Sequence, residues 1–333
     1  MTIDTDAFSA QLRAAAVDTK SRRLLVTRFT DTAQEDDLSE PTNCNGHGRI
    51  RHFRRGTSAG WPDNPIPIDP ASAALGLDST DSLTAQVFQN AACNWRCWYC
   101  FVPFKLLNAN ESRSSWVTAS TLVDWFAQVD PRPPVIDLSG GQPDLVPEWT
   151  AWMAAELIDR GLDGEVYLWV DDNLSNDYYW RYLSDSERAS IASYRAHGRV
   201  GCFKGYDAES FAFNTGAAPE LFDRQFELMR RHIDDGTDCY GYVTLTAGTE
   251  ADPTDAMTVF VDRLQQIDEH LPLRVVPLEI AVWGPVAPRV RAAHTQALVH
   301  QAQAVAAWNR EIASRFASSL RERAINEIPV LGR

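Results

Sequence analysis

The chain has 333 residues, 44% of them hydrophobic and 23% charged, which is typical of a globular protein with a sizeable core and excludes global disorder. The formal net charge of −14 argues against a surface that binds nucleic acid or an anionic membrane as a whole. The N-terminus lacks a signal-peptide pattern, and no apolar run is long enough to span a membrane. These features predict a cytoplasmic protein.

Residues 1–85 are predicted to form an N-terminal extension that packs on the domain that follows. A helix is expected at residues 7–18 and a strand at 23–29, after which the chain is rich in loops and proline. A basic run within the extension carries four arginines, whose guanidinium groups suit carboxylate or phosphate partners: Arg49, Arg51, Arg54 and Arg55. The run indicates contacts to an anionic organic substrate, although a solvated face or salt bridges to an acidic surface would also account for it.

From residue 86 onward, short apolar segments typical of buried parallel strands alternate with helical patterns. The expected strands are residues 86–90, 135–138, 165–170, 199–204, 240–246 and 274–282. The expected helices include residues 119–129, 148–160, 220–235 and 292–323. Six such units predict an α/β fold, a partial (βα)6 TIM-like barrel over residues 86–323, with a C-terminal tail at 324–333.

Three cysteines follow the first of these strands, where a barrel of this kind carries its active-site loops. Cys93, Cys97 and Cys100 have the spacing C-x3-C-x2-C, and a tetrahedral zinc site would need a fourth ligand that the neighbouring sequence does not offer. Three thiolates can instead hold an iron–sulfur cluster with one iron left open. A structural zinc loop and three unrelated thiols remain the alternatives. Cys44, Cys202 and Cys239 are scattered, and Cys202 is expected to be a small core residue.

The cysteine spacing resembles the signature of the radical S-adenosylmethionine (radical SAM) superfamily, whose core is also a (βα)6 partial barrel. The resemblance implies a [4Fe–4S] cluster whose fourth iron is chelated by S-adenosylmethionine (SAM). It further implies that an electron from a donor such as flavodoxin or ferredoxin cleaves SAM to a 5′-deoxyadenosyl radical, which takes hydrogen from the substrate. Tyr99 lies where the family places an aromatic residue near the adenine.

The turn after the second strand reads Gly140-Gly141-Gln142-Pro143, and paired glycines allow backbone to approach a ligand closely. It resembles the Gly-Gly-Glu-Pro motif of the family, which holds the amino group of SAM, except that Gln142 replaces glutamate. An amide keeps one acceptor oxygen and loses the charge.

Polar residues also end the third and fourth strands. By resemblance, Asp171 and Asn173 would contact the ribose or the methionine end of SAM, while the alternative is an ordinary polar turn. Lys204 lies in a stretch similar to the Asp-Leu-Lys-Gly of glycyl-radical activating enzymes, with Cys202 in place of the aspartate. Its ammonium would pair with the SAM carboxylate or an anionic substrate, unless it only caps a loop at the barrel rim.

The sequence therefore predicts an enzyme that cleaves SAM reductively and takes hydrogen from an anionic small molecule in a biosynthetic pathway. The alternatives within enzymes are the activation or modification of a protein, suggested by the Lys204 stretch, and the modification of tRNA or a nucleotide, suggested by the arginine run. Outside enzymes, an iron–sulfur sensor is the alternative.

Overall fold

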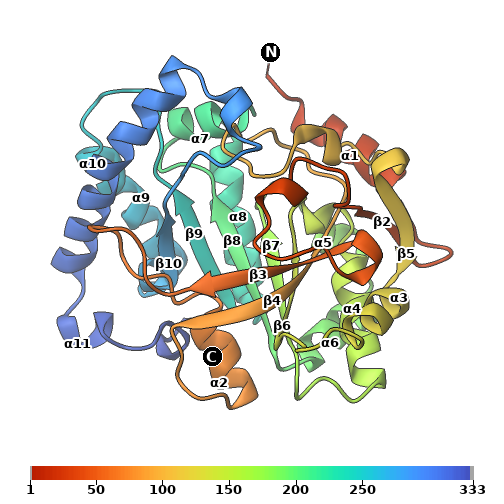
Figure 1. Ribbon diagram of the computed structural model, residues 1–333. Helices are drawn as coiled ribbons and strands as arrows, with labels where there is room; N and C mark the ends of the chain where they lie inside the picture. The colour runs from red at the N-terminus through yellow and green to blue at the C-terminus, as the bar shows by residue number, and fades with distance from the viewer. Residues whose placement is uncertain (1, 331–333) are drawn as a thin grey trace.

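The computed structural model describes residues 2–330 and centres on a curled sheet of seven strands in the order β10-β9-β8-β7-β6-β4-β3 (Figure 1). Six strands are parallel neighbours and β3 alone runs antiparallel, next to β4. The strands are β3 (Gly48–Arg54), β4 (Ser82–Gln89), β6 (Val135–Ser139), β7 (Tyr167–Asp172), β8 (His197–Phe203), β9 (Cys239–Thr244) and β10 (Val275–Leu278). The predicted α/β partial barrel with six parallel strands is confirmed.

Helices surround the outer face of the sheet, as expected for successive right-handed crossovers. The α-helices of the described residues are α1 (Thr5–Ala16), α2 (Ile68–Leu75), α3 (Ala119–Phe126), α4 (Glu148–Asp159), α5 (Tyr178–Tyr182), α6 (Asp185–Ser193), α7 (Ala208–Thr215), α8 (Leu221–Asp234), α9 (Thr254–Ile267), α10 (Ala292–Arg315) and α11 (Ser318–Arg321), of which α2 lies at the end of the sheet. The Thr118 side chain accepts a hydrogen bond from the Thr121 amide, so α3 begins at the expected cap. Over residues 2–330, no helix is both long and apolar enough to cross a bilayer.

Two predicted elements are shorter than expected. The helix predicted at residues 292–323 ends at Arg315, because Phe316 has extended backbone angles (φ −124°, ψ 133°) and the chain then turns into α11. The last strand stops at Leu278 and contains Pro277, which pairs with Val243. Proline is tolerated there because β10 is an edge strand with a partner on one side only.

The N-terminal extension contributes directly to the barrel sheet, which the sequence did not indicate. Strand β3 pairs with β4 from Gly48 opposite Phe88 to Arg54 opposite Ser82. Elsewhere β2 (Arg23–Thr27) lies between β1 (Val17–Asp18) and β5 (Ser114–Thr118) in a small antiparallel sheet. The extension is therefore joined to the barrel by backbone hydrogen bonds at two places.

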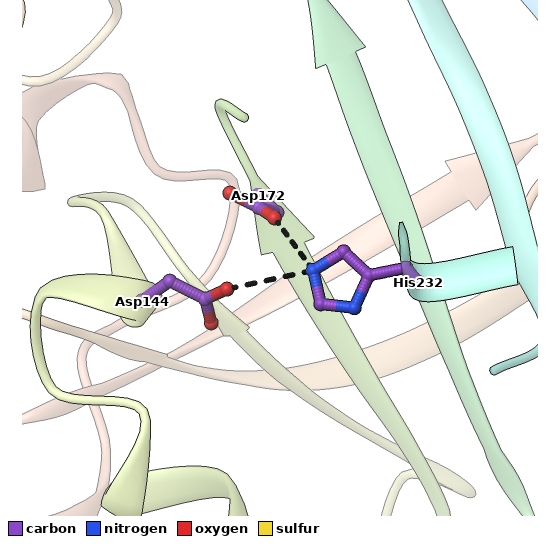
Figure 2. Close-up of side chains that lie close together, drawn as sticks. All are labelled: Asp144, Asp172 and His232. Atoms are coloured by element: carbon purple, nitrogen blue, oxygen red, sulfur yellow. Dashed lines mark ion pairs between the residues drawn. The ribbon is translucent and has the colours of Figure 1, made fainter. Parts of the chain in front are cut away.

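A group of charged residues is buried between strands β7 and β8 and the helices that cover their outer face. The fully buried Arg199 of β8 donates from Nη1 to Oδ2 of Asp144 (2.7 Å) and to Oδ2 of Asp172 (3.2 Å). His232 of α8 points at both carboxylates, with Nε2 at 3.8 Å and 3.5 Å from the same two oxygens (Figure 2). Burial and the charge of Arg199 lower the pKa of His232 to about 4, so the ring is neutral at pH 7. Arg199 is therefore the cation that compensates the two buried carboxylates.

Replacing Arg199 by methionine is expected to destabilise the protein by about 3–5 kcal/mol, because two buried carboxylates lose their counter-charge. The measurement is the free energy of unfolding in urea. Arg188→Met is the control, since Arg188 pairs with the exposed Asp185 and its loss should cost at most about 1 kcal/mol. Equal effects of the two substitutions would contradict a compensating role for Arg199.

Candidate functional site

A cavity of about 360 Å³ lies at the carboxyl edge of the parallel strands. Nearly all the predicted site residues line it: Cys93, Cys97, Tyr99, Cys100, Gly140, Gly141, Gln142, Asp171, Asn173 and Lys204. Pro143 does not, because it begins the buried 3-10 helix Pro143–Leu145 behind the turn. A larger hollow of about 690 Å³ elsewhere contains none of the three cysteines. The structure thus brings together motifs from four separate loops.

The cysteine loop is held in place by backbone hydrogen bonds to α7 and to the segment that follows it in the chain. The Arg96 amide donates to Thr215 O and the Trp98 amide to Asn214 O, each at 3.1 Å, and the Cys93 amide donates to Leu107 O at 3.1 Å. These contacts fix the loop on both sides, so the directions of the three thiol-bearing side chains are set by the surrounding fold.

The three thiols suit a metal group larger than a single zinc ion. Within residues 2–330, the one group of three or more potential ligands whose atoms all lie within 4.8 Å is the buried Asp144, Asp172 and His232. At least two of the three cysteine sulfurs are therefore further apart than in a tetrahedral zinc site, where Zn–S bonds of about 2.3 Å place them about 3.8 Å apart. An iron–sulfur cluster, with one thiolate on each of several irons, accommodates such spacing.

Cys97 and Cys100 are protonated when no metal is bound. Burial raises the pKa of Cys97 to about 12 and also raises that of Cys100. Metal must therefore displace the thiol protons, and assembly of a cluster at this loop releases them.

The glycine turn after β6 packs directly on the backbone of the cysteine loop. A Cβ at Gly141 would lie 2.3 Å from Asn90 O and 2.4 Å from Ala92 O, too close for any other residue. Gly140 has φ +83°, in the left-handed region that favours glycine. The Gln142 amide donates to Ala92 O at 2.7 Å. Both glycines are thus required for the close approach of the two loops.

The contacts of Gln142 explain why this chain has glutamine where the Gly-Gly-Glu-Pro motif has glutamate. Its side chain is fully buried, with Nε2 donating to Asp172 Oδ1 (2.8 Å) and Oε1 accepting from the Asn173 amide (2.9 Å). A glutamate has no such donor and would place a second carboxylate against that of Asp172. The amide therefore joins the glycine turn to the end of β7.

The remaining predicted residues surround the cysteines at short range. Asn173 Nδ2 lies 3.9 Å from Cys93 Sγ, and the Tyr99 hydroxyl is 2.9 Å from Thr244 Oγ1. Asp171 Oδ2 accepts from Ser139 Oγ at 2.5 Å. The Lys204 backbone is held on both sides, its amide donating to Gln225 Oε1 and its carbonyl accepting from Asn214 Nδ2. Its ammonium is thereby held at the cavity with the cysteines.

The four arginines of the basic run do not share one site, because side chains alternate between the two faces of β3. Arg51 lines the cavity and Arg49 is buried on the same face. Arg54 is exposed on the other face. Arg55 lies beyond the strand, where it pairs with Asp69 and lines the separate larger hollow. The expectation that all four contact a substrate in one place is therefore wrong for Arg54 and Arg55.

Several lining residues were missed by sequence reasoning. Cys202, expected in the core, lines the cavity beside Lys204, and Tyr242 lies across from it on β9. The exposed rings of Phe101 and Trp283 stand at the cavity wall, at 37% and 58% exposure. Tyr242 and Trp283 carry no sequence signal, whereas the alternation 49, 51, 53 in β3 could have indicated that Arg51 points inward.

A Gly141→Ala substitution is expected to destabilise the protein by about 1–3 kcal/mol, since the added methyl group must push the turn away from the cysteine loop. The free energy of unfolding in urea measures this. Gly164→Ala serves as the control, because a Cβ there would meet no atom within 4 Å and should change stability by less than about 0.5 kcal/mol. If Gly141→Ala behaved like the control, the close packing of the two loops would be disproved.

No protein-family model matches the chain, and no curated protein sequence does so either. Among solved structures, SuiB of Streptococcus suis bound to S-adenosylmethionine aligns at 17% identity and a TM-score of 0.38, over 53% of this chain and 36% of SuiB. A structure described as TYW1 with a lysine–pyruvate adduct bound aligns at 13% identity and a TM-score of 0.37, over 66% of this chain and 72% of that one. The matched region is thus about a third of the length of SuiB. Similarity at this level assigns neither fold nor function, which rest on the residues of the chain itself.

Proposed function

We propose that the chain is a radical SAM enzyme, with a [4Fe–4S] cluster on Cys93, Cys97 and Cys100 and SAM bound in the adjoining cavity. The single observation that carries this proposal is that the cysteine loop and the Gly140–Gly141 turn line the same cavity at the carboxyl edge of a six-stranded parallel sheet. The fourth protein thiol at the cavity, Cys202, is contributed by another strand and is absent from the cysteine motif. The motif itself leaves one iron without a protein ligand.

When bound, the cluster and SAM together supply the radical that takes hydrogen from an organic substrate. The chain's own part is to bind, orient and shield. The backbone of the Gly140–Gly141 turn lines the cavity and would hold the SAM ammonium, as the resemblance implies, and the Lys204 ammonium is available to a carboxylate there. Tyr99 is held by Thr244 so that its ring forms one wall. Asp171 and Asn173 offer hydrogen-bond partners to hydroxyl or amino groups.

The substrate in this proposal is an anionic small molecule of a biosynthetic pathway. Two cationic side chains, Arg51 and Lys204, line the cavity and would attract the anionic group, while the acidic residues Asp171, Asp172 and Glu279 also line it. The electron is supplied by an external donor of the flavodoxin or ferredoxin type. A reducing compartment such as the cytoplasm would preserve the cluster.

Cys93→Ala is expected to reduce SAM cleavage to background, because two protein thiolates would not hold the cluster in a fixed position beside the cavity. The protein is reconstituted anaerobically with iron and sulfide, then given dithionite and SAM, and 5′-deoxyadenosine is quantified. Cys44→Ala is the matched control and should keep both cluster and cleavage, since Cys44 lies outside the cavity.

Cleavage at the wild-type rate by Cys93→Ala would refute the proposed cluster site. A reconstituted wild-type protein that holds the cluster but never cleaves SAM would favour an iron–sulfur sensor instead. Accelerated 5′-deoxyadenosine formation on addition of one candidate metabolite would identify the substrate.

A further inference from the structure

Arg49 of β3 is a buried cation that forms no ion pair within residues 2–330. Its exposure is 7%, yet among residues 2–330 no carboxylate lies within 4 Å of it and Nε has no hydrogen-bond acceptor. Aromatic rings lie beside it, with the guanidinium carbon 5.2 Å from the ring centre of Phe101 and 6.0 Å from that of Phe29. Burial lowers the pKa of Arg49 to about 10, so the side chain remains charged at pH 7.

Other buried arginines of this chain each form an ion pair with a carboxylate. Arg13 pairs with Glu148, Arg199 with Asp144 and Arg274 with Asp238. A buried charge without a counter-ion is costly, and proteins normally pair it or bind an ion to it. Arg49 therefore differs from these three buried arginines in that no carboxylate pairs with its guanidinium group.

The carboxylates nearest to Arg49 are already engaged. Arg51, two residues along the same face, donates from Nη1 to Asp137 Oδ2 at 3.0 Å and lies 3.8 Å from Asp171 Oδ2. Burial raises the pKa of Asp137 to about 7, with Asp171 adding to the rise and Arg51 opposing it. Asp137 and Asp171 attract Arg49 through space, but both contact Arg51 instead, so Arg49 has no carboxylate of its own.

The position of Arg49 connects it to the cavity. In the register of β3 on β4, Arg51 is opposite Ala85 and Arg49 is opposite Val87, two residues nearer to the cysteine loop that follows β4. Phe101, whose ring is the closest to Arg49, follows Cys100 directly and lines the cavity. Arg49 does not itself line the cavity, but an anion that reached between Arg51 and Phe101 would lie next to its guanidinium.

We propose that Arg49 binds an oxyanion, a carboxylate or phosphate, belonging to a molecule that occupies the cavity beside Arg51. Guanidinium groups bind both oxyanions through paired, charge-assisted hydrogen bonds. Assigning that molecule as the substrate, or as SAM through its own carboxylate, rests on the proposed function. The site itself rests on the buried cation and its neighbours.

The first experiment measures thermal unfolding of the full chain at constant ionic strength, in sodium chloride and after exchange of chloride for inorganic phosphate or acetate. The proteins are wild type, Arg49→Met and Arg54→Met, the last being the control because Arg54 is on the same strand and exposed. Phosphate or acetate should raise the Tm of wild type and Arg54→Met but leave that of Arg49→Met unchanged. In chloride alone, Arg49→Met should unfold at the same temperature as wild type or higher, because an unpaired buried charge is gone.

A merely structural role of Arg49 gives the opposite result. If its packing on Phe29 and Phe101 were its purpose, Arg49→Met would unfold at a lower temperature than wild type in chloride. Such a lower Tm of Arg49→Met in chloride would overturn the proposal. It would also be overturned if phosphate or acetate raised the Tm of all three proteins equally, or did not raise the Tm of wild type.

The second experiment identifies the source of the oxyanion, using the reconstituted protein and equilibrium binding of SAM and of decarboxylated SAM. If the carboxylate of SAM occupies the site, Arg49→Met should weaken SAM binding about tenfold or more and leave decarboxylated SAM unaffected. If the substrate occupies it, both cofactors should bind Arg49→Met as they bind wild type, while the phosphate or acetate response is lost. Wild-type protein that shows the Arg49-dependent response but no SAM cleavage would refute the proposed function and retain the anion site.

Discussion

The contact between the glycine turn after β6 and the cysteine loop after β4 is the constraint on which the cavity depends. Gly141 meets Asn90 O and Ala92 O at distances that leave no space for a Cβ. The turn continues into Gln142, whose amide joins it to Asp172 and Asn173 at the end of β7. Three strand ends are thereby fixed relative to one another, and the three thiols take their directions from that arrangement.

The same chain of contacts continues into the layer between the sheet and the helices outside it. Asp172 accepts from Gln142 through Oδ1 and from Arg199 through Oδ2, and Arg199 also holds Asp144 just after the glycine turn. A buried charge group of this kind contributes little net stability compared with apolar packing, but it penalises any displacement that separates its members. This buried charge group therefore favours one relative placement of β6, β7 and β8 at the side of the cavity.

The antiparallel strand β3 closes one side of this half-barrel and gives the cavity its cationic wall. A parallel sheet of six strands leaves an open edge, and β3 pairs with that edge from the N-terminal side of the chain. Its pleat directs Arg49 and Arg51 inward and Arg54 outward, so one strand supplies both the charge beside the cysteines and a solvated exterior. The extension is thus part of the cavity wall.

The sequence by itself determined the six parallel strands, the loop that carries the three cysteines and the paired glycines, because apolar periodicity, cysteine spacing and glycine turns are local signals. The sequence could not show which arginines of the basic run face the cavity and which face solvent, because that depends on the register of β3 on β4. It also gave no reason for Gln142, whose amide is explained only by a carboxylate thirty residues away in the chain, Asp172. Tertiary structure decided these points because pairing and hydrogen bonding across the barrel join residues that are distant in sequence.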